Sequence, residues 1–243
     1  MIRLISCFDI KNNMVVKGVG FNNLKIIENP VNLINKYINS KIDEIVLLDI
    51  TSNYTKKSLS NLVIKKISKI LDVPLSIGGG INTLEKISKL LKLGADRIII
   101  NSYCYENICF LKKITSYYGS QLLIVAIDIK KRKDSFLTYK NSGFKKTNFF
   151  LEDWCIIVKK MGCGEILLTS IEKDGNKNGY DINSLYHIKK MIDISIIISG
   201  GMGSINDIYY IFKYLKTNSF LIASLFHYNF LKTSYLKKYL KFI

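Results

Sequence analysis

The sequence predicts an α/β protein: a single (β/α)₈ barrel, spanning residues 1–243, built from two duplicated half-barrels. Three observations support this prediction. Short apolar runs alternate with longer amphipathic segments along the whole chain, and there are eight of each. The length of 243 residues suits one such barrel, and no linker or low-complexity segment divides it. The ends of the apolar runs in the first half recur, in order, in the second half.

The predicted strands are short runs rich in Ile, Val and Leu. Runs that are apolar throughout are typical of strands buried on both faces, as in a parallel sheet covered by helices. In chain order the strands are predicted at Leu4–Ile10, Glu44–Ile50, Val73–Ile77, Arg97–Asn101, Leu122–Asp128, Glu165–Thr169, Ser195–Ser199 and Phe220–Ser224. An open, doubly wound sheet is the alternative, because periodicity alone does not show that the sheet closes.

Between the strands lie segments in which apolar residues recur at helical spacing, as in helices that pack one face on a core. They are predicted at Val31–Asn39, Ser58–Leu71, Leu84–Leu93, Cys109–Tyr118, Leu151–Met161, Ile182–Ile192, Ile205–Tyr214 and Tyr228–Leu240. Two connections, Met14–Val19 after the first strand and Phe136–Lys146 after the fifth, are predicted to form local hairpins. These hairpins follow matching strands, so the predicted repeat extends into the loops.

The duplication is inferred from four pairs of strand ends that match in the same order. The tripeptide Asp-Ile-Lys closes both the first and the fifth strand. The pairs are Asp9 with Asp128, Asp49 with Thr169, Gly79 with Gly200, and Ser102 with Ser224. The separation within a pair drifts by only one residue from each pair to the next, which chance seldom produces.

The net charge of +17 favours, at first sight, a basic nucleic-acid-binding module. Lysine carries nearly all of the excess, since Arg3, Arg97 and Arg132 are the only arginines. Arginine is the residue that recognises bases and phosphates bidentately. The lysines are spread along the whole chain, as on solvated helix surfaces. We therefore predict no nucleic-acid partner and assign part of the charge to attraction for anionic ligands.

Cysteine and histidine usage argues against a disulfide framework and against a metal site. The five cysteines form no CxxC pair and their number is odd, which predicts reduced thiols in a cytoplasmic protein. With only His187 and His227 present, a His/Cys metal centre is not expected. No apolar run reaches the roughly 20 residues that span a bilayer, and no signal peptide is recognised, so no membrane association is predicted.

Functional residues of a barrel gather on the loops at the C-terminal ends of its strands. Two groups there are candidates for holding phosphate: a first cradle of Gly79, Gly80, Asn101 and Ser102, and a second cradle of Gly200, Gly201, Ala223 and Ser224. Glycine lets backbone N–H groups approach an anion closely. Tight turns that need positive φ are the alternative for one glycine pair. Two duplicated cradles instead favour a substrate that is phosphorylated at both ends.

Acidic and hydroxyl side chains lie between the two cradles. The repeat places Asp9 and Asp128 across the barrel mouth, where paired carboxylates suit general acid/base catalysis. Strand-end caps or ion pairs with neighbouring lysines are the alternative for these two. Asp49 and Thr169 are predicted to hydrogen-bond the substrate. Asp174, in the loop after the sixth strand, could reach the site or simply form an Asp-Gly turn.

Charged residues open several strands at the opposite, N-terminal end of the barrel. They are Arg3, Glu44, Arg97 and Glu165, two of each sign. If their side chains point inward, they form a ring of ion pairs across the barrel floor. Burying four charges is costly unless all of them are fully paired. Ordinary charges that point outward are the alternative.

These residues resemble a known family. The segments CFDIKNNMVVKG, DEIVLLDIT, IGGGI, GADRIIIN, GSQ, VAIDIKK, GEILLTSIEKDGNKNGYD, SGGMG and IASLFH resemble, in order, the cyclase subunit of imidazole glycerol phosphate synthase, the HisF family of histidine biosynthesis. The resemblance covers essentially the whole chain. It implies a (β/α)₈ barrel that condenses ammonia with a bis-phosphorylated ribulosyl aminoimidazole carboxamide nucleotide. The implied products are imidazole glycerol phosphate and aminoimidazole carboxamide ribotide, with no cofactor or metal.

The resemblance also implies roles for single residues. Asp9 and Asp128 match the acid and base of the family, and Lys17 matches a lysine that helps to hold the substrate. Ammonia would come from a glutaminase subunit docked on the N-terminal face, where Asp96 and Gln121 match docking positions. It would pass through the barrel by way of the charged ring, which the family uses as a gate.

Two departures from the family pattern bear on this interpretation. Arg97 stands where the gate usually has lysine, and Gly20 replaces an asparagine in the loop after the first strand. Two related enzymes are alternatives: the sister isomerase of the same pathway, and the cyclase-like subunit of surface-sugar amidation. The motifs VVKG, GSQ and KDGNKNGYD favour the cyclase over the isomerase, and the Asp9/Asp128 pair favours it over the amidation subunit.

Overall fold

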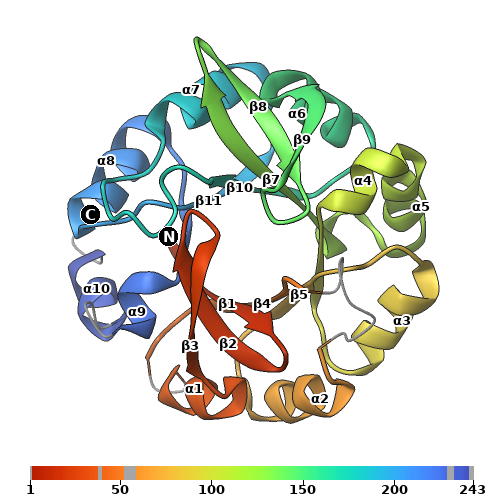
Figure 1. The fold of residues 1–243 in the computed structure, drawn as a ribbon, viewed down its shortest axis with the longest axis vertical. Coiled ribbons are helices and arrows are strands. Elements are labelled where there is room, and N and C mark those ends of the chain that lie inside the picture. Colours follow the sequence, from red (N-terminus) through yellow and green to blue (C-terminus); the bar gives the residue numbers. More distant parts are fainter. Residues whose placement is uncertain (1, 38–39, 52–58, 229–232, 241–243) are drawn as a thin grey trace.

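The computed structural model describes residues 2–37, 40–51, 59–228 and 233–240. Within them eight parallel strands form a closed barrel, seen end-on in Figure 1. The barrel strands are β1 (Arg3–Lys11), β4 (Glu44–Asp49), β5 (Leu75–Gly78), β6 (Arg97–Ile100), β7 (Leu123–Arg132), β10 (Glu165–Ser170), β11 (Ser195–Ser199) and β12 (Ser219–Ile222). Each pairs in parallel with the next, and β12 returns to β1 with Phe220 opposite Leu4. The (β/α)₈ prediction is confirmed, and the open-sheet alternative is wrong.

Helices surround the barrel in a ring (Figure 1). They are α1 (Pro30–Tyr37), α2 (Asn61–Ile70), α3 (Leu84–Lys92), α4 (Ser102–Glu106), α5 (Ile108–Tyr118), α6 (Leu151–Lys160), α7 (Ile182–Met191), α8 (Ile205–Leu215), α9 (Ser224–His227) and α10 (Thr233–Leu240). The short helices α4 and α9 were not predicted. The predicted helix start at Tyr228 is wrong, because Tyr228 is a turn residue directly after α9; residues 229–232 lie outside the described part of the chain. The predicted strand end at Ser224 belongs to α9. Asn39 and Ser58, predicted helix ends, lie outside the described residues.

Both predicted hairpins are present and rise from matching strands. β1 continues into β2 (Met14–Val19) and β3 (Asn22–Glu28), and β7 continues into β8 (Ser135–Lys140) and β9 (Lys145–Phe150). Figure 1 shows the first hairpin in red and the second in green, both at the mouth of the barrel. The turn from β1 to β2 is made by Asn12 and Asn13, which have φ of 51° and 61°. Asn tolerates this left-handed conformation, which tight hairpin turns require.

The strand register repeats between the two halves. In β1 and β4, Ile5 lies opposite Glu44, and in β7 and β10 the equivalent Ile124 lies opposite Glu165. Pairing of β12 with β1 likewise matches pairing of β6 with β7, where Ile98 lies opposite Leu123. One predicted match is wrong by one residue: Leu48 lies opposite Asp9 as Thr169 lies opposite Asp128, so Thr169 corresponds to Leu48 and not to Asp49. The other three matched pairs lie at the same height in the barrel.

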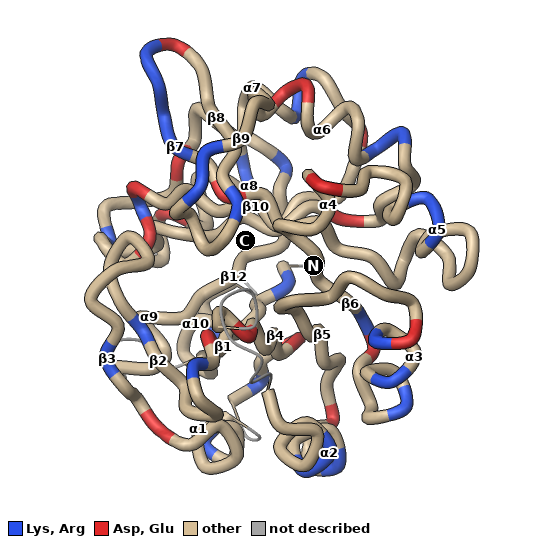
Figure 2. The backbone as a smooth tube through the Cα atoms, turned by 45° about the vertical axis from the view of Figure 1, so that its right-hand side comes forward, with Lys and Arg blue, Asp and Glu red and all other residues tan. Residues whose placement is uncertain are grey.

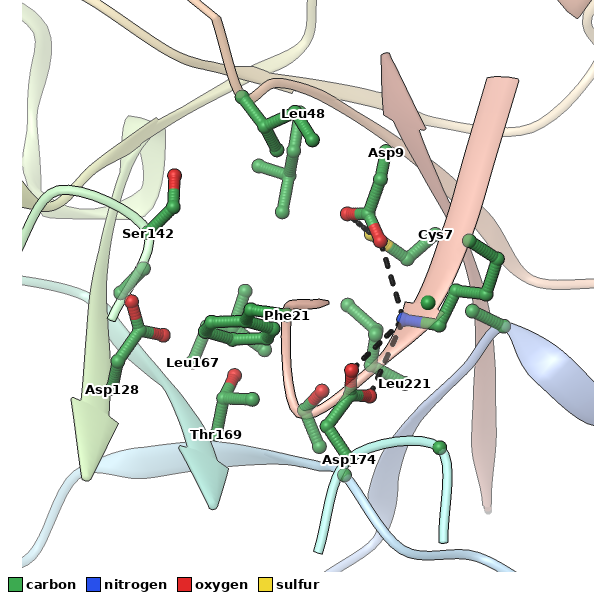
Figure 3. A pocket seen from close by; sticks show the side chains of 18 of the residues that line it. Cys7, Asp9, Phe21, Leu48, Asp128, Ser142, Leu167, Thr169, Asp174 and Leu221 are labelled. Carbon is green, nitrogen blue, oxygen red and sulfur yellow. Dashed lines mark hydrogen bonds and ion pairs between the residues drawn. The ribbon is translucent and has the colours of Figure 1, made fainter. Parts of the chain in front are cut away.

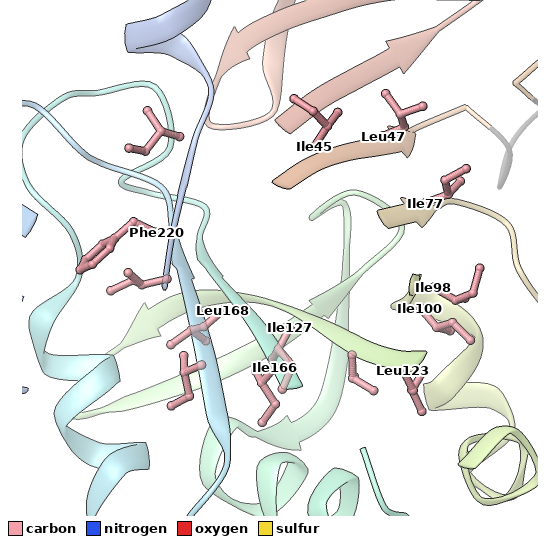
Figure 4. Close-up of a cluster of buried hydrophobic side chains, with 14 of the residues drawn as sticks. Ile45, Leu47, Ile77, Ile98, Ile100, Leu123, Ile127, Ile166, Leu168 and Phe220 are labelled. Carbon is pink, nitrogen blue, oxygen red and sulfur yellow. The ribbon is translucent and has the colours of Figure 1, made fainter. Parts of the chain in front are cut away.

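Two apolar layers hold the barrel together. Outward-facing strand residues pack against the helices; Ile45, Leu47, Ile77, Ile98, Ile100, Leu123, Ile127, Ile166, Leu168 and Phe220 are labelled in Figure 4. The alternate residues fill the barrel interior as a separate cluster that includes Ile5, Val46, Ile124 and Ile197. Burying a side chain of this size contributes roughly 1.5–3 kcal/mol. The period-2 alternation explains why the strands are apolar on both faces.

The lysines and arginines lie all around the molecule. Figure 2 shows them on helices α2, α3, α5 and α6 and on the hairpin of β7 and β8. This distribution agrees with the prediction of solvated helix surfaces and gives no support to a nucleic-acid-binding face. None of the helices in the described part of the chain is long and apolar enough to cross a membrane.

Candidate active site

A cavity of about 440 Å³ opens at the C-terminal ends of the strands. The predicted substrate residues that line it are Asp9, Lys17, Asp49, Gly79, Asn101, Ser102, Asp128, Thr169, Asp174, Gly200, Gly201, Ala223 and Ser224. Of the predicted set, all of which the structure describes, only Gly80 falls outside the lining, and its carbonyl accepts a hydrogen bond from Lys86 at 2.7 Å. The fold therefore gathers residues that are far apart in the sequence into one site.

Lys17 joins two carboxylates on one wall of this cavity. In the pairing of β2 with β1, Val16 lies opposite Asp9. The next residue, Lys17, therefore lies close to Asp9 at the same end of β1. The Lys17 Nζ lies 3.2 Å from Asp9 Oδ2, and 3.3 and 3.2 Å from the two carboxylate oxygens of Asp174 (Figure 3). Burial lowers the pKa of Lys17, but the two carboxylates outweigh burial and hold this pKa above its ordinary value. Lys17 is therefore a buried, permanently charged partner of both acids.

Asp128 stands on the opposite wall in a different environment. Asn101, at the end of β6, donates a hydrogen bond from Nδ2 to Asp128 Oδ2 at 2.8 Å. Burial raises the pKa of Asp128 to about 7; Asn101 opposes this rise, and repulsion from Asp174 and Asp9 adds to it. Two residues that match in the repeat thus differ chemically: Asp9 is ion-paired, whereas Asp128 holds a proton for part of the time at neutral pH.

The carboxylate of Asp49 holds two described residues that follow β4. It accepts hydrogen bonds from the backbone N–H and the hydroxyl of Thr51 at 3.0 and 2.9 Å, and from the backbone N–H of Leu59 at 2.7 Å. Sequence reasoning predicted a substrate contact for Asp49 and missed these hydrogen bonds within the protein. Thr169 is buried on β10, opposite Asp128 of β7, and lies on the cavity wall in Figure 3.

The cradle glycines satisfy a backbone requirement as well as lining the cavity. Gly79 has φ of 112°, and a Cβ there would lie 2.3 Å from the carbonyl oxygen of Asp49. Gly201 has φ of 113°, and its Cβ would lie 2.3 Å from the carbonyl oxygen of Gly179. A side chain at either position would both strain the backbone and overlap a neighbouring strand end or loop. The turn alternative is therefore correct about the conformation of these glycines, and it does not compete with their place on the cavity wall.

The first hairpin folds over the cavity. Its tip is Gly20 and Phe21; the Gly20 N–H donates to the carbonyl of Asp174 at 3.0 Å, and the Phe21 ring projects into the cavity (Figure 3). A Cβ on Gly143, at the tip of the second hairpin, would lie 2.9 Å from the Phe21 ring, so the two tips meet above the barrel. Sequence reasoning missed Phe21 and Ser142, because an aromatic residue in a hairpin usually signals packing and a lone serine carries no signal.

The four charged strand openers point inward and pair with one another. Arg3 Nη2 lies 2.5 Å from Glu165 Oε1, and Arg97 Nη2 lies 2.7 Å from Glu165 Oε2. The two arginines also reach Glu44, at 3.9 and 3.6 Å, and the Ser76 hydroxyl donates to Glu44 at 2.5 Å. These contacts close the ring across the barrel floor, and the outward-pointing alternative is wrong. Burial raises the pKa of Glu44, an effect that Ser76 and the arginines oppose.

Asp96 and Gln121 lie at this same end of the barrel. The Asp96 carboxylate accepts a hydrogen bond from the backbone N–H of Leu75 at 2.8 Å, which fixes the start of β5. The backbone carbonyl of Gln121 accepts from Arg97 Nε at 3.3 Å. Arg97 is therefore held through Nε by a backbone carbonyl as well as by two carboxylates.

Comparison with known proteins identifies the family. A family model described as "Histidine biosynthesis protein" matches residues 3–232. The "Imidazole glycerol phosphate synthase subunit HisF" of Natranaerobius thermophilus is 41% identical over 238 residues, covering 98% of this chain and 95% of that protein. Proteins of the same name from Saccharolobus solfataricus and Hydrogenobaculum sp. are 40% and 42% identical, with the same coverage. This chain belongs to the HisF family. HisF membership favours the cyclase interpretation over the sister isomerase, and it confirms the resemblance found in the motifs.

Proposed function

We propose that this chain is the cyclase subunit of an imidazole glycerol phosphate synthase. It condenses ammonia with the bis-phosphorylated ribulosyl aminoimidazole carboxamide nucleotide, closes the imidazole ring of imidazole glycerol phosphate and releases aminoimidazole carboxamide ribotide. The observation that carries the proposal is the pair Asp9 and Asp128 on opposite walls of one cavity, in unlike environments and between two duplicated cradles. Membership of the HisF family supports the same reaction.

The unlike environments divide the acid and base roles. Asp128, with a pKa of about 7, is the proton-holding member and serves as the general acid. The negative charge of a bound bis-phosphate favours its protonated form further. Asp9, whose charge is neutralised by Lys17 at 3.2 Å, is the carboxylate that accepts a proton as the general base.

The remaining cavity residues hold the substrate and exclude water. The backbone N–H groups and hydroxyls of the two cradles bind the two phosphates. Lys17 and Asp174 exchange part of their mutual ion pair for contacts with the substrate between the cradles. Phe21, on the hairpin that already lies over the cavity, shields the reacting atoms from solvent.

We further propose a glutaminase subunit as the partner, docked on the N-terminal face. The relatives are named as subunits, which supports a partner of some kind. Asp96, Gln121 and the charged ring lie together at that face. Ammonia would cross the ring and travel along the apolar barrel interior to the acid/base pair. Arg97 would act as the moving member of this gate, restrained by its contact with the Gln121 carbonyl.

A turnover assay with the nucleotide substrate and an ammonium salt at alkaline pH, without any glutaminase, tests the reaction. We expect imidazole glycerol phosphate to form, and we expect Asp9→Asn and Asp128→Asn each to lower kcat by about a hundredfold or more. The exposed Asp134, in the turn between β7 and β8, offers a matched control, since Asp134→Asn should leave turnover unchanged. Near-normal turnover in either active-site variant would refute the assigned roles. Conversion of the isomerase substrate instead would identify the sister enzyme.

A further inference from the structure

His227 is a buried side chain that the proposed reaction does not use. It ends α9, it is 8% exposed, and its ring makes two hydrogen bonds. Nε2 lies 2.8 Å from the backbone carbonyl of Cys7, and Nδ1 lies 2.8 Å from the hydroxyl of Tyr37 on α1. A carbonyl only accepts, so Nε2 carries the proton and Nδ1 accepts from Tyr37. Burial lowers the pKa of His227 to about 4, so the ring is neutral at physiological pH.

The bond to Cys7 fills a gap that the barrel leaves at this point. The ladder between β12 and β1 ends with Ile222 opposite Ser6, one residue before Cys7. The chain then turns away into α9, so β12 supplies no further ladder donor to the buried end of β1. The imidazole N–H of His227 supplies a donor instead, and its ring packs edge-on against Phe8 at 5.2 Å. A buried carbonyl without a partner would be costly.

The same side chain fixes the position of the second cradle. Its Ser224 is the first residue of α9, which is a single turn closed by the bond from the His227 N–H to the Ala223 carbonyl at 2.9 Å. So short a helix has little stability of its own. Its position relative to the barrel therefore depends on side-chain anchors, and His227 ties it to β1, two residues before Asp9.

The first cradle is anchored by different chemistry. The repeat matches α4 with α9, and Tyr105 follows Ser102 by the same three residues that separate His227 from Ser224. The Tyr105 ring stacks on Trp154 of α6, with centroids 4.1 Å apart and planes 18° apart. One half-barrel thus uses aromatic stacking where the other uses a hydrogen-bonded imidazole. The first half supplies a natural control for the second.

We infer that His227 is a positioning residue for the second cradle. Its neutral ring holds Ala223 and Ser224 in fixed relation to the strand that carries Asp9, so that a phosphate bound there places the substrate correctly for the acid/base pair. This inference rests on the proposed role of the second cradle in phosphate binding. It assigns no proton transfer to His227, which is screened from the cavity by the backbone it holds.

A titration with inorganic phosphate, followed through the backbone amide resonances, tests the inference directly. The amide of Ser224 reports the second cradle, and the amide of Ser102 reports the first within the same molecule. His227→Phe keeps the ring against Phe8 but removes both hydrogen bonds. We expect it to weaken phosphate binding at Ser224 by about fivefold, the fold-change of roughly one hydrogen bond, with no change at Ser102. His227→Gln, which restores an N–H near the Cys7 carbonyl, should recover most of the affinity.

Two further variants separate positioning from general stability. Tyr37→Phe removes only the hydroxyl that Nδ1 accepts from, and it should weaken phosphate binding at Ser224 in the same direction. Tyr105→Phe, which leaves the stack on Trp154 intact, should not change binding at Ser224. In turnover, His227→Phe should raise KM by about fivefold and change kcat by less than about twofold.

Several results would overturn the inference. Equal phosphate affinity at Ser224 in the wild type and in His227→Phe would do so while leaving the proposed function intact. Equal loss at Ser224 and Ser102 would mean that His227 supports the fold alone. If His227→Phe does not fold, Tyr37→Phe and His227→Gln decide the question by the same readout. Absence of any phosphate shift in the wild-type protein would instead refute the cradles themselves, and with them the inference.

Discussion

The hydrogen bond from Asn101 to Asp128 makes a sharp prediction about the pH dependence of turnover. In the wild type, Asn101 Nδ2 donates to the buried Asp128 carboxylate at 2.8 Å, and this hydrogen bond opposes the rise of the Asp128 pKa. Asn101→Ala removes the donor. A hydrogen bond to a charged group contributes about 1.5–3 kcal/mol, and one pKa unit corresponds to about 1.4 kcal/mol. The pKa of Asp128 should therefore move from about 7 in the wild type to about 8 or 9 in the variant.

The sign of the effect identifies the role of Asp128. If it is the general acid, kcat/KM falls as pH rises through its pKa, and Asn101→Ala moves this falling limb to higher pH by about one to two units. The assay is kcat/KM for the nucleotide between pH 5.5 and 9.5, with the concentration of free ammonia held constant at each pH. Asn101 also belongs to the first cradle, so the position of the limb, not the absolute rate, is the readout.

Asn218→Ala, an exposed substitution at the far end of the barrel, is the control and should leave the limb in place. An unmoved falling limb in Asn101→Ala would show that another group titrates. A limb that rises through pH 7 and shifts upward in the variant would show that Asp128 is the base, and would reverse the assignment made above.

Three other predictions concern stability and the ring. Because the pKa of Asp128 is raised on folding, the native state binds more protons than the unfolded state between pH 4 and 7, so stability falls as pH rises. Asp128→Asn should therefore raise the free energy of unfolding at pH 8 by on the order of a few kcal/mol, and by less toward pH 4. Urea titrations at the two pH values measure this difference. Glu165→Gln leaves Arg3 and Arg97 short of a partner and should lower the free energy of unfolding by about 1–3 kcal/mol in the same urea titrations. The loss is kept small because both arginine side chains are partly exposed. An unchanged urea midpoint would show that the ring adds nothing to stability. Gly201→Ala should lower the free energy of unfolding by about 2 kcal/mol or more. Gly20→Ala is the matched control: its Cβ would meet only one atom, at 3.5 Å, and it should lower the free energy of unfolding by about 1 kcal/mol. Equal melting temperatures of the two variants would refute the steric argument.

Hydrophobic periodicity and the internal repeat were enough to predict the barrel. The run Ser195–Ser199 consists of three isoleucines between two serines, so its limits could be read directly, and the observed strand is identical. The one-turn helices α4 and α9 could not be predicted, because a single turn shows no periodicity. Whether the ring residues point inward was also open, since a strand that is apolar on both faces gives no sign of which parity faces the interior.

The candidate site was predictable where the repeat marked it and not elsewhere. Asp9 and Asp128 stood out because they match across the two halves and close buried strands. Phe21 could not be found, because its place in the cavity depends on a positive φ of 66° that no local signal requires of phenylalanine. The chemical difference between the two aspartates was likewise invisible, since it arises from Lys17 and Asn101, which reach them through pairing and packing.

The contact between Lys17 and Asp174 has a consequence for how the site exchanges its contents. This ion pair and the Gly20–Asp174 hydrogen bond fasten the first hairpin over the mouth of the cavity. A polyanion that takes Lys17 as its counter-charge must compete for it with Asp174. Because this ion pair is buried, added salt screens it much less than it screens the long-range attraction between the ligand and the site. Association of a polyanion should therefore slow as ionic strength rises, while the hairpin stays fastened over the mouth.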